Sequence, residues 1–268
     1  MNDWLHALPI LWMAALVFGV TYLVTAAIYA AVMGLASTER GRTFKGSSAG
    51  MLPPMGILFG LFVAFTAAQA WSQNERAAAA VDREASALKS VLVYATALPQ
   101  AQQTRLHDLI AGYIAKAVNV EWPRMAERVA TLDINPQKLS DALELVLSEM
   151  PATAGQQGAQ REILADLNAA LDARRTRILI SHEQVNFVKW SALLIQAVCA
   201  LIAIALVHAE SRRAGGLMMT LFATGIATSV LLILAHDRPF AGQLRVGPEP
   251  LLQVVPAPGI AVEPADHG

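Results

Sequence analysis

Four long apolar runs divide this chain, and each is long enough to predict a membrane-crossing helix. They cover residues 9–35, 53–70, 187–207 and 217–235. The second run passes about eighteen residues without a charge, enough to cross a bilayer at the helical rise. The pattern therefore predicts an all-α, polytopic membrane protein with four transmembrane helices.

The second run has the most regular pattern. Pro53-Pro54 is placed where a helix can start without losing a hydrogen bond, and Trp71 is placed to anchor the far end in the interface. Two sets of residues recur at four-residue spacing, and each set shares one helix face. The first set is Pro53, Ile57, Leu61 and Phe65, and the second is the GxxxG pair Gly56 and Gly60. The glycines predict a close contact with another helix.

Between the second and third runs, residues 72–186 are alanine-rich and carry charges of both signs. Leu and Val recur there at helical spacing, which predicts a bundle of four amphipathic helices. The cluster Arg174, Arg175 and Arg177 is interpreted as a patch facing solvent or lipid headgroups. The expected apolar stripes are Val81, Ala85, Leu88, Leu92 and Ala95; Leu106, Ile110, Tyr113 and Ala117; Leu139, Leu143, Val146 and Met150; and Leu164, Leu171, Ile178 and Val185.

These patterns divide the chain into four parts. Residues 1–71 hold the first two spans, 72–186 a helical extramembrane domain, 187–236 the last two spans, and 237–268 a C-terminal motif with a tail. After about residue 253 the tail is rich in Pro and Ala, a composition typical of disorder. Residues 37–50, rich in Gly and Ser, are expected to form a flexible loop.

Composition narrows the function. Over half of the residues are hydrophobic and 15% are charged, against about a quarter in soluble domains. The net charge of -1 gives no support for a nucleic-acid partner. No catalytic motif, metal-ligand spacing or cofactor motif is found, and the single cysteine cannot form an internal disulfide. We expect a multi-pass protein of the cell membrane (the inner membrane in a Gram-negative cell), without cofactor or enzymatic activity.

The side on which the helical domain lies is left open by the charges. The two short loops are basic, which favours a cytoplasmic location for them. Basic residues also flank the helical domain within the distance that the rule counts, so the charge count does not decide. The loop cations are Arg40, Arg42, Lys45, Arg212 and Arg213; the flanking ones include Arg76, Arg83, Lys89, Arg174 and Lys189.

Several short motifs give the chain a resemblance to a known family. The second span holds Pro54, Gly60, Phe62, Val63 and Trp71 in the register that bestrophin anion channels show. The later motifs are Glu121-Trp122-Pro123 and Asp237-Arg238-Pro239-Phe240-Ala241-Gly242. With two spans, a helical domain and two further spans, the chain resembles the prokaryotic bestrophin-like family, which is distantly similar to those channels.

The resemblance implies a homopentamer in the lipid bilayer, with small anions passing along a central axis lined by the second spans. Carried over by residue, the pore positions are Pro53, Ile57 and Leu61. It also implies a cytoplasmic helical domain. The side chains at the pore positions are smaller and aliphatic where the channels favour aromatics, and residues 243–255 contain one acid, Glu249, so a calcium switch is not supported.

Two functions from different classes remain. The first is an oligomeric anion channel. The second is a membrane-anchored sensor or scaffold whose helical domain binds a ligand or partner. Chloride flux from liposomes, with Ile57→Ala and Leu61→Ala as gate tests, separates the two.

Overall fold

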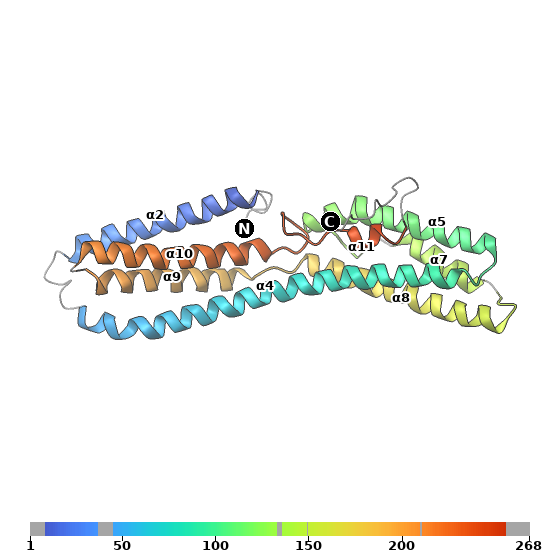
Figure 1. Ribbon diagram of the computed structural model, residues 1–268, viewed down its shortest axis with the longest axis horizontal. Coiled ribbons are helices and arrows are strands. Elements are labelled where there is room, and N and C mark those ends of the chain that lie inside the picture. Colours follow the sequence, from blue (N-terminus) through green and yellow to red (C-terminus); the bar gives the residue numbers. More distant parts are fainter. Residues whose placement is uncertain (1–8, 37–44, 133–135, 149, 210, 256–268) are drawn as a thin grey trace, which may run out of the picture. The chain divides into compact units, whose positions relative to one another are not determined.

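The computed structural model describes residues 9–36, 45–132, 136–148, 150–209 and 211–255. Within these ranges every regular element is a helix, so the predicted all-helical class is confirmed (Figure 1). The elements are α2 (Ile10–Ala36), α4 (Lys45–Ala95), α5 (Gln100–Lys116), the π-helix η1 (Ala117–Glu121), α6 (Trp122–Ala126), α7 (Gln137–Ser148), α8 (Ala154–Ser181), α9 (Phe187–Val207), α10 (Arg212–His236) and α11 (Glu249–Leu252).

The chain forms two compact units. The membrane unit comprises Met1–Asn74, Gln184–Arg238 and Gly242–Arg245, and the helical unit comprises Glu75–Glu183, Pro239–Ala241 and Val246–Gly268. The chain passes from the first unit to the second inside α4. The C-terminal segment, predicted as a separate part after residue 236, contributes to both units.

In the membrane unit α2, α9 and α10 pack on one another, and Phe59 and Ala67 of α4 join the same core. The four helices are long and apolar enough to span a bilayer, as the sequence predicts. Each presents a broad apolar surface outward, which is the arrangement that a hydrocarbon solvent favours. The core of this unit also contains Met13, Val17, Leu193, Ala197, Met219 and Ala227.

The start of α4 differs from the prediction. The helix begins at Lys45, so Pro53 and Pro54 lie inside it and not at its first turn. Gly and Ser disfavour a helix by at most about 1 kcal/mol per residue. Extension of an existing helix, in contrast, gains a hydrogen bond for each added residue. The part of the expected loop at 37–44, with Arg40 and Arg42, lies outside the described residues.

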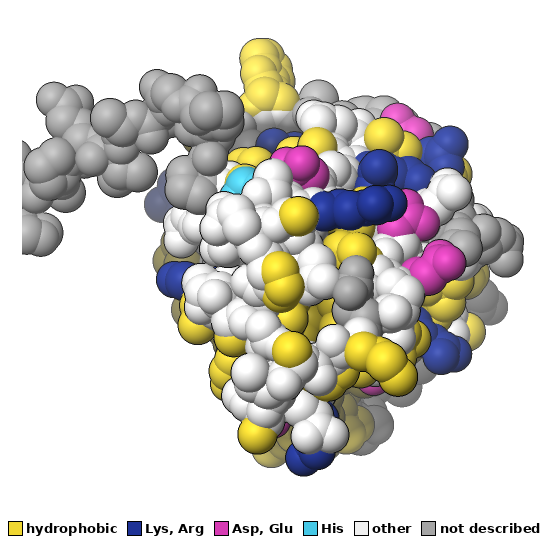
Figure 2. Space-filling model, turned by 90° about the vertical axis from the view of Figure 1, so that its right-hand side faces the viewer, with side chains coloured by type: hydrophobic (Ala, Val, Ile, Leu, Met, Phe, Trp, Pro, Cys, Tyr) yellow, Lys and Arg dark blue, Asp and Glu magenta, His cyan; other side chains and the backbone are white. Residues whose placement is uncertain are grey.

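In the helical unit the distal half of α4 packs with α5, α7 and α8 (Figure 1). The predicted stripes of α4 and α5 are largely confirmed, since Val81, Leu88, Leu106 and Ile110 are fully buried. In the stripe of α7, Leu139 and Val146 are buried as predicted and Leu143 is partly buried, whereas Met150 follows the helix end and is 94% exposed. On one face of the molecule, side chains of both charge signs are interspersed with apolar ones (Figure 2).

The stripe predicted for α8 is wrong in part. The helix ends at Ser181, so Val185 does not belong to it, and Leu164 and Leu171 are only partly buried. The buried face lies one position away from the predicted one at most turns. The buried residues of α8 are Ala159, Ile163, Leu167, Ala170, Ala173, Arg174, Arg177, Ile178, Ile180 and Ser181.

The segment after α10 returns to the helical unit and closes its core. Phe240, Leu251 and Val254 are buried there. Gly242 has φ 83°, a backbone conformation that strains residues with a Cβ. The tail predicted to be disordered lies largely at 256–268, outside the described residues.

Candidate functional site

The face of α4 that was predicted to line a pore is open in the single chain. Ile57 is 69% exposed, Leu61 51% and Phe65 66%, and Pro53 is exposed as well. Phe59, on another side of the helix, is buried in the membrane unit. The four residues therefore form a continuous apolar ridge, available to lipid or to another copy of the chain.

The glycine pair lies beside this ridge. A Cβ added to Gly56 or Gly60 meets no described atom within 4 Å. The close helix contact predicted for these glycines is thus not made among the described residues of one chain, and a contact between chains stays a prediction.

The far end of the span has interfacial side chains. Trp71 is 46% exposed and meets the His236 ring edge-on at 6.2 Å. The Lys189 ammonium of α9 donates to the side-chain oxygen of Gln69 on α4. An aromatic and a cation that flank an apolar helix are typical of the membrane–water boundary.

A second constellation lies in the core of the helical unit, where four charged side chains and a tyrosine are buried together. Glu84 of α4 and Arg177 of α8 have no exposed surface, and Glu121 and Arg174 are each 4% exposed. We call Glu84, Tyr113, Glu121, Arg174 and Arg177 the buried ion network.

The network joins its members through paired hydrogen bonds. Arg177 donates from Nε to Oε2 of Glu84 at 2.7 Å and from Nη2 to Oε1 of Glu84 at 3.0 Å. The same Nη2 lies 2.9 Å from Oε2 of Glu121. Arg174 donates from Nε and Nη2 to Oε1 of Glu121 at 2.9 and 2.7 Å, and the Tyr113 hydroxyl donates to Glu84. Two carboxylates face two guanidinium groups, so the network is electrically balanced.

Local backbone geometry places these side chains. Arg174 and Arg177 are three residues apart on α8 and so share one face. Glu121 is the last residue of the π-helix η1, whose wider turn displaces the following side chains from the α-helical register. The π turn thereby contributes to placing Glu121 opposite the two arginines.

The network shifts the pKa of its members. Burial by itself raises the pKa of the Glu121 carboxyl, but the hydrogen bond from Arg174 and the charges of Arg177 and Arg174 lower it below its usual value overall. Burial raises the pKa of Tyr113 well above its usual value, and the Glu84 charge adds to this. For Arg177, burial lowers the pKa, but the Glu84 carboxylate outweighs burial and raises it. Glu121 and Arg177 are therefore charged at neutral pH.

The structure brings the Glu121-Trp122-Pro123 motif and the Asp237–Gly242 motif together beside the buried ion network. The Trp122 ring lies 5.9 Å from the Phe240 ring, edge to face, and its Nε1 donates to the carbonyl of Val246 at 3.2 Å. The guanidinium carbon of Arg177 stands 4.5 Å from the centre of the Trp122 ring. Pro123 is exposed, and Gly242 allows the turn after Phe240.

The first two residues of the Asp237–Gly242 motif belong to the membrane unit. Asp237 is buried and accepts a hydrogen bond at 2.7 Å from the backbone N–H of Val185, just before α9. Arg238, the next residue in the sequence, is also buried. The Asp-Arg-Pro-Phe run thus has its first two residues in one unit and its last two in the other.

The expectation for the arginine cluster is wrong for two of its members. Arg175 is exposed as predicted, whereas Arg174 and Arg177 are buried. Glu84 and Tyr113 were not singled out from the sequence as functional residues. Helical spacing could have indicated their burial. Glu84 and Tyr113 lie on the predicted apolar faces of α4 and α5, and the two buried arginines lie on the same face of α8 as Ile163 and Leu167.

The network links α4, η1 and α8 within the helical unit. Each carboxylate is matched by a guanidinium, and the described residues contain no group of three His, Cys, Asp or Glu that could hold a metal ion. Buried ion pairs of this kind are costly to break, because removing one partner leaves an uncompensated charge.

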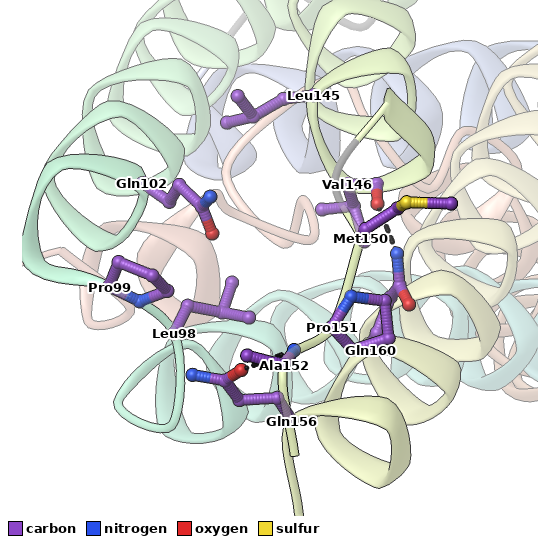
Figure 3. Close-up of a pocket in the computed structure, with 10 residues that line it drawn as sticks. All are labelled: Leu98, Pro99, Gln102, Leu145, Val146, Met150, Pro151, Ala152, Gln156 and Gln160. Carbon is purple, nitrogen blue, oxygen red and sulfur yellow. Dashed lines mark hydrogen bonds between the residues drawn. The ribbon is translucent and has the colours of Figure 1, made fainter. Parts of the chain in front are cut away.

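A cavity of about 160 Å³ opens elsewhere in the helical unit, between α5, α7 and α8 (Figure 3). Its wall is mostly apolar, with glutamine side chains at the α8 side. The side-chain oxygen of Gln156 accepts from the N–H of Ala152 at 2.9 Å, and Nε2 of Gln160 donates to the carbonyl of Val146 at 2.6 Å. Gln156 therefore binds the α7–α8 connection, and Gln160 binds the last turn of α7.

Comparison with known proteins gives one result. A family model described as "Bestrophin-like domain" matches residues 15–251, which include most of the first candidate span, the whole of the other three and the buried ion network. No curated protein and no solved structure matches the chain.

Proposed function

The chain belongs to the bestrophin-like family, and from that membership we propose that it assembles into homo-oligomers of the cell membrane that conduct small anions along an axis lined by α4. The resemblance in the second span supports a pentamer. The observation that carries the proposal is the exposed apolar ridge Pro53, Ile57, Leu61 and Phe65 on that helix.

A change of character along α4 supports a pore-facing role more than a lipid-facing one. Beyond Phe65 the exposed positions on the same side of the helix are Ala68 and Ser72, which are small, and Ser72 is polar. A lipid-facing helix has no need for this change. If the helix lines a pore, the pore is narrow at Ile57 and Leu61 and becomes wider and more hydrated where the lining side chains are small.

The physical mechanism is dewetting. A ring of Ile57 and Leu61 side chains excludes water when it is narrow, and ions then pass only after it widens. Residues 52–74 carry no acidic side chain, and acidic rings are the typical filter of cation channels. The preference for anions rests on the resemblance.

The test is chloride release from liposomes that contain the purified protein. We expect flux from the wild-type protein and faster flux from Ile57→Ala and Leu61→Ala, since smaller side chains widen and wet the ring. Leu23→Ala is the matched control, because Leu23 lies 71% exposed on α2. Its flux should equal that of the wild type.

The mass in detergent provides the second measurement, and a homo-oligomer should run at a multiple of 28.6 kDa. Absence of flux from all variants of a correctly assembled oligomer would contradict conduction. It would favour a membrane-anchored sensor or scaffold. The 160 Å³ cavity is the structural feature that such a function would use, with a bound ligand detected by a rise in melting temperature.

A further inference from the structure

A second cavity lies in the membrane unit. It has a volume of about 370 Å³ and is open along one side. Its wall consists of Leu52 from α4, Ile204 and His208 from the end of α9, and Met218, Leu221 and Phe222 from α10. His208 is the one polar side chain among these six, so the groove is suited to a hydrocarbon chain.

The groove has a defined depth in the bilayer. It starts at the connection between α9 and α10, where α9 ends at Val207 and α10 begins at Arg212. Phe222 lies ten residues further along α10, about 15 Å at the helical rise. That depth is about half of the hydrocarbon core, so the groove runs from the surface toward the midplane as one acyl chain does.

The shallow end of the groove is basic. Arg212 and Arg213 are exposed at the first turn of α10, and His208 lies at the groove wall. Glu210 lies outside the described residues. The Tyr29 hydroxyl donates to the Arg212 carbonyl at 2.9 Å, and Gly215 packs closely on His208, which fixes the connection against α2 and α10. Guanidinium groups at headgroup level attract anionic lipids.

We propose that this groove binds an anionic phospholipid, with one acyl chain along Leu52, Ile204, Leu221 and Phe222 and the phosphate held by Arg212 and Arg213. The site is separate from the ridge of α4 at Ile57 and Leu61, so it stands whether or not the protein conducts ions.

The test uses the full chain in a mild neutral detergent, titrated with phosphatidylglycerol or phosphatidylcholine and measured by native mass spectrometry. One basic side chain near an anionic surface changes binding about fivefold. We therefore expect phosphatidylglycerol to bind up to about 25-fold more tightly than phosphatidylcholine, because the choline ammonium of the latter offsets the charge of its phosphate. Arg212→Gln with Arg213→Gln should remove this difference.

A second pair of variants tests the acyl groove. Leu221→Trp fills it and should weaken both lipids. Leu217→Trp is the control, since Leu217 is 58% exposed on α10 outside the groove and should leave binding unchanged. Two further titrations use oleate and glycerol phosphate. They distinguish binding of an acyl chain alone, or of a phosphate alone, from binding of the whole lipid.

Three results would overturn the proposal. The first is equal affinity for the two phospholipids, and the second is unchanged binding in Leu221→Trp. The third is a changed oligomer mass in Leu221→Trp with lipid binding intact, which would assign the groove to a contact between chains.

Discussion

The guanidinium of Arg177 lies against the face of Trp122, with its carbon 4.5 Å from the ring centre, while its edges bind Glu84 and Glu121. The planar fork of arginine suits this double use, since hydrogen bonds occupy its rim and an aromatic ring its face. One side chain of α8 therefore holds α4, η1 and α6 together in the helical unit.

Removing this side chain should be strongly destabilising. Arg177→Met leaves Glu84 buried without its cation, at an expected cost of about 3–5 kcal/mol. The loss should appear as a lower melting temperature of the full chain in detergent, followed by circular dichroism. Arg175→Met is the matched control, because Arg175 is exposed two residues away. It should change stability by no more than about 0.5 kcal/mol, and equal losses in the two variants would contradict the role of the network.

The charge of Glu84 should account for part of that loss. In the double variant Glu84→Gln with Arg177→Met, no carboxylate is left uncompensated at position 84. The glutamine can still accept a hydrogen bond from Tyr113. We expect the double variant to be more stable than Arg177→Met alone, with a coupling energy of about 0.5–3 kcal/mol in a double-mutant cycle. Strict additivity of the two single changes would show that the side chains act independently.

Acid should weaken the helical unit through Glu121. Its pKa in the folded chain is below the usual 4.5, because hydrogen bonds and charge from the arginines outweigh burial. A group with a depressed folded pKa contributes stability above its unfolded pKa, and that contribution is lost as the pH falls through the folded value. The melting temperature should therefore decrease as the pH is lowered from about 4.5. Glu121→Gln should be less stable at pH 7 and less sensitive in the acid range, and a parallel pH profile would contradict this account.

The C-terminal motif should stabilise the helical unit from a distance in sequence. Phe240→Ala removes a buried ring from Trp122 and should cost about 3–5 kcal/mol. The near-ultraviolet circular dichroism should weaken as Trp122 loses its neighbour. Phe187→Ala serves as control, since Phe187 is 75% exposed, and it should leave the spectrum unchanged. A stable Phe240→Ala protein with an unaltered spectrum would show that the motif is not needed for packing.

Local pattern was enough to predict the spans and most of the bundle. The spans are recognised from long runs without charge, and the bundle helices from apolar residues at helical spacing, such as Leu106 and Ile110. Both patterns involve only residues that are close in the sequence. The exposure of Ile57 and Leu61 on one face follows in the same way. Their use as a pore depends on other copies of the chain and stays a prediction.

The buried ion network could not be predicted by the same reasoning. Glu84 and Arg177 are 93 residues apart, and burial of each is tolerable only because the other is there. Hydropathy treats every arginine as exposed, so the seam of α8 was assigned one position away, to Leu164 and Leu171. The π turn that places Glu121 also has no simple sequence signature. Contacts between distant charged residues, and not local preference, determine this part of the core.

The return of Pro239–Ala241 to the helical unit has a consequence for biosynthesis. Trp122 meets Val246 124 residues later in the chain, and at typical ribosomal rates that separation corresponds to on the order of ten seconds of elongation. Until then Arg177 can cover one face of the indole, but Phe240 and Val246 are absent, because α9 and α10 must be made first. A nascent protein that lacks its last two hydrophobic segments therefore also lacks Phe240, Leu251 and Val254, and the core of its helical unit stays incomplete.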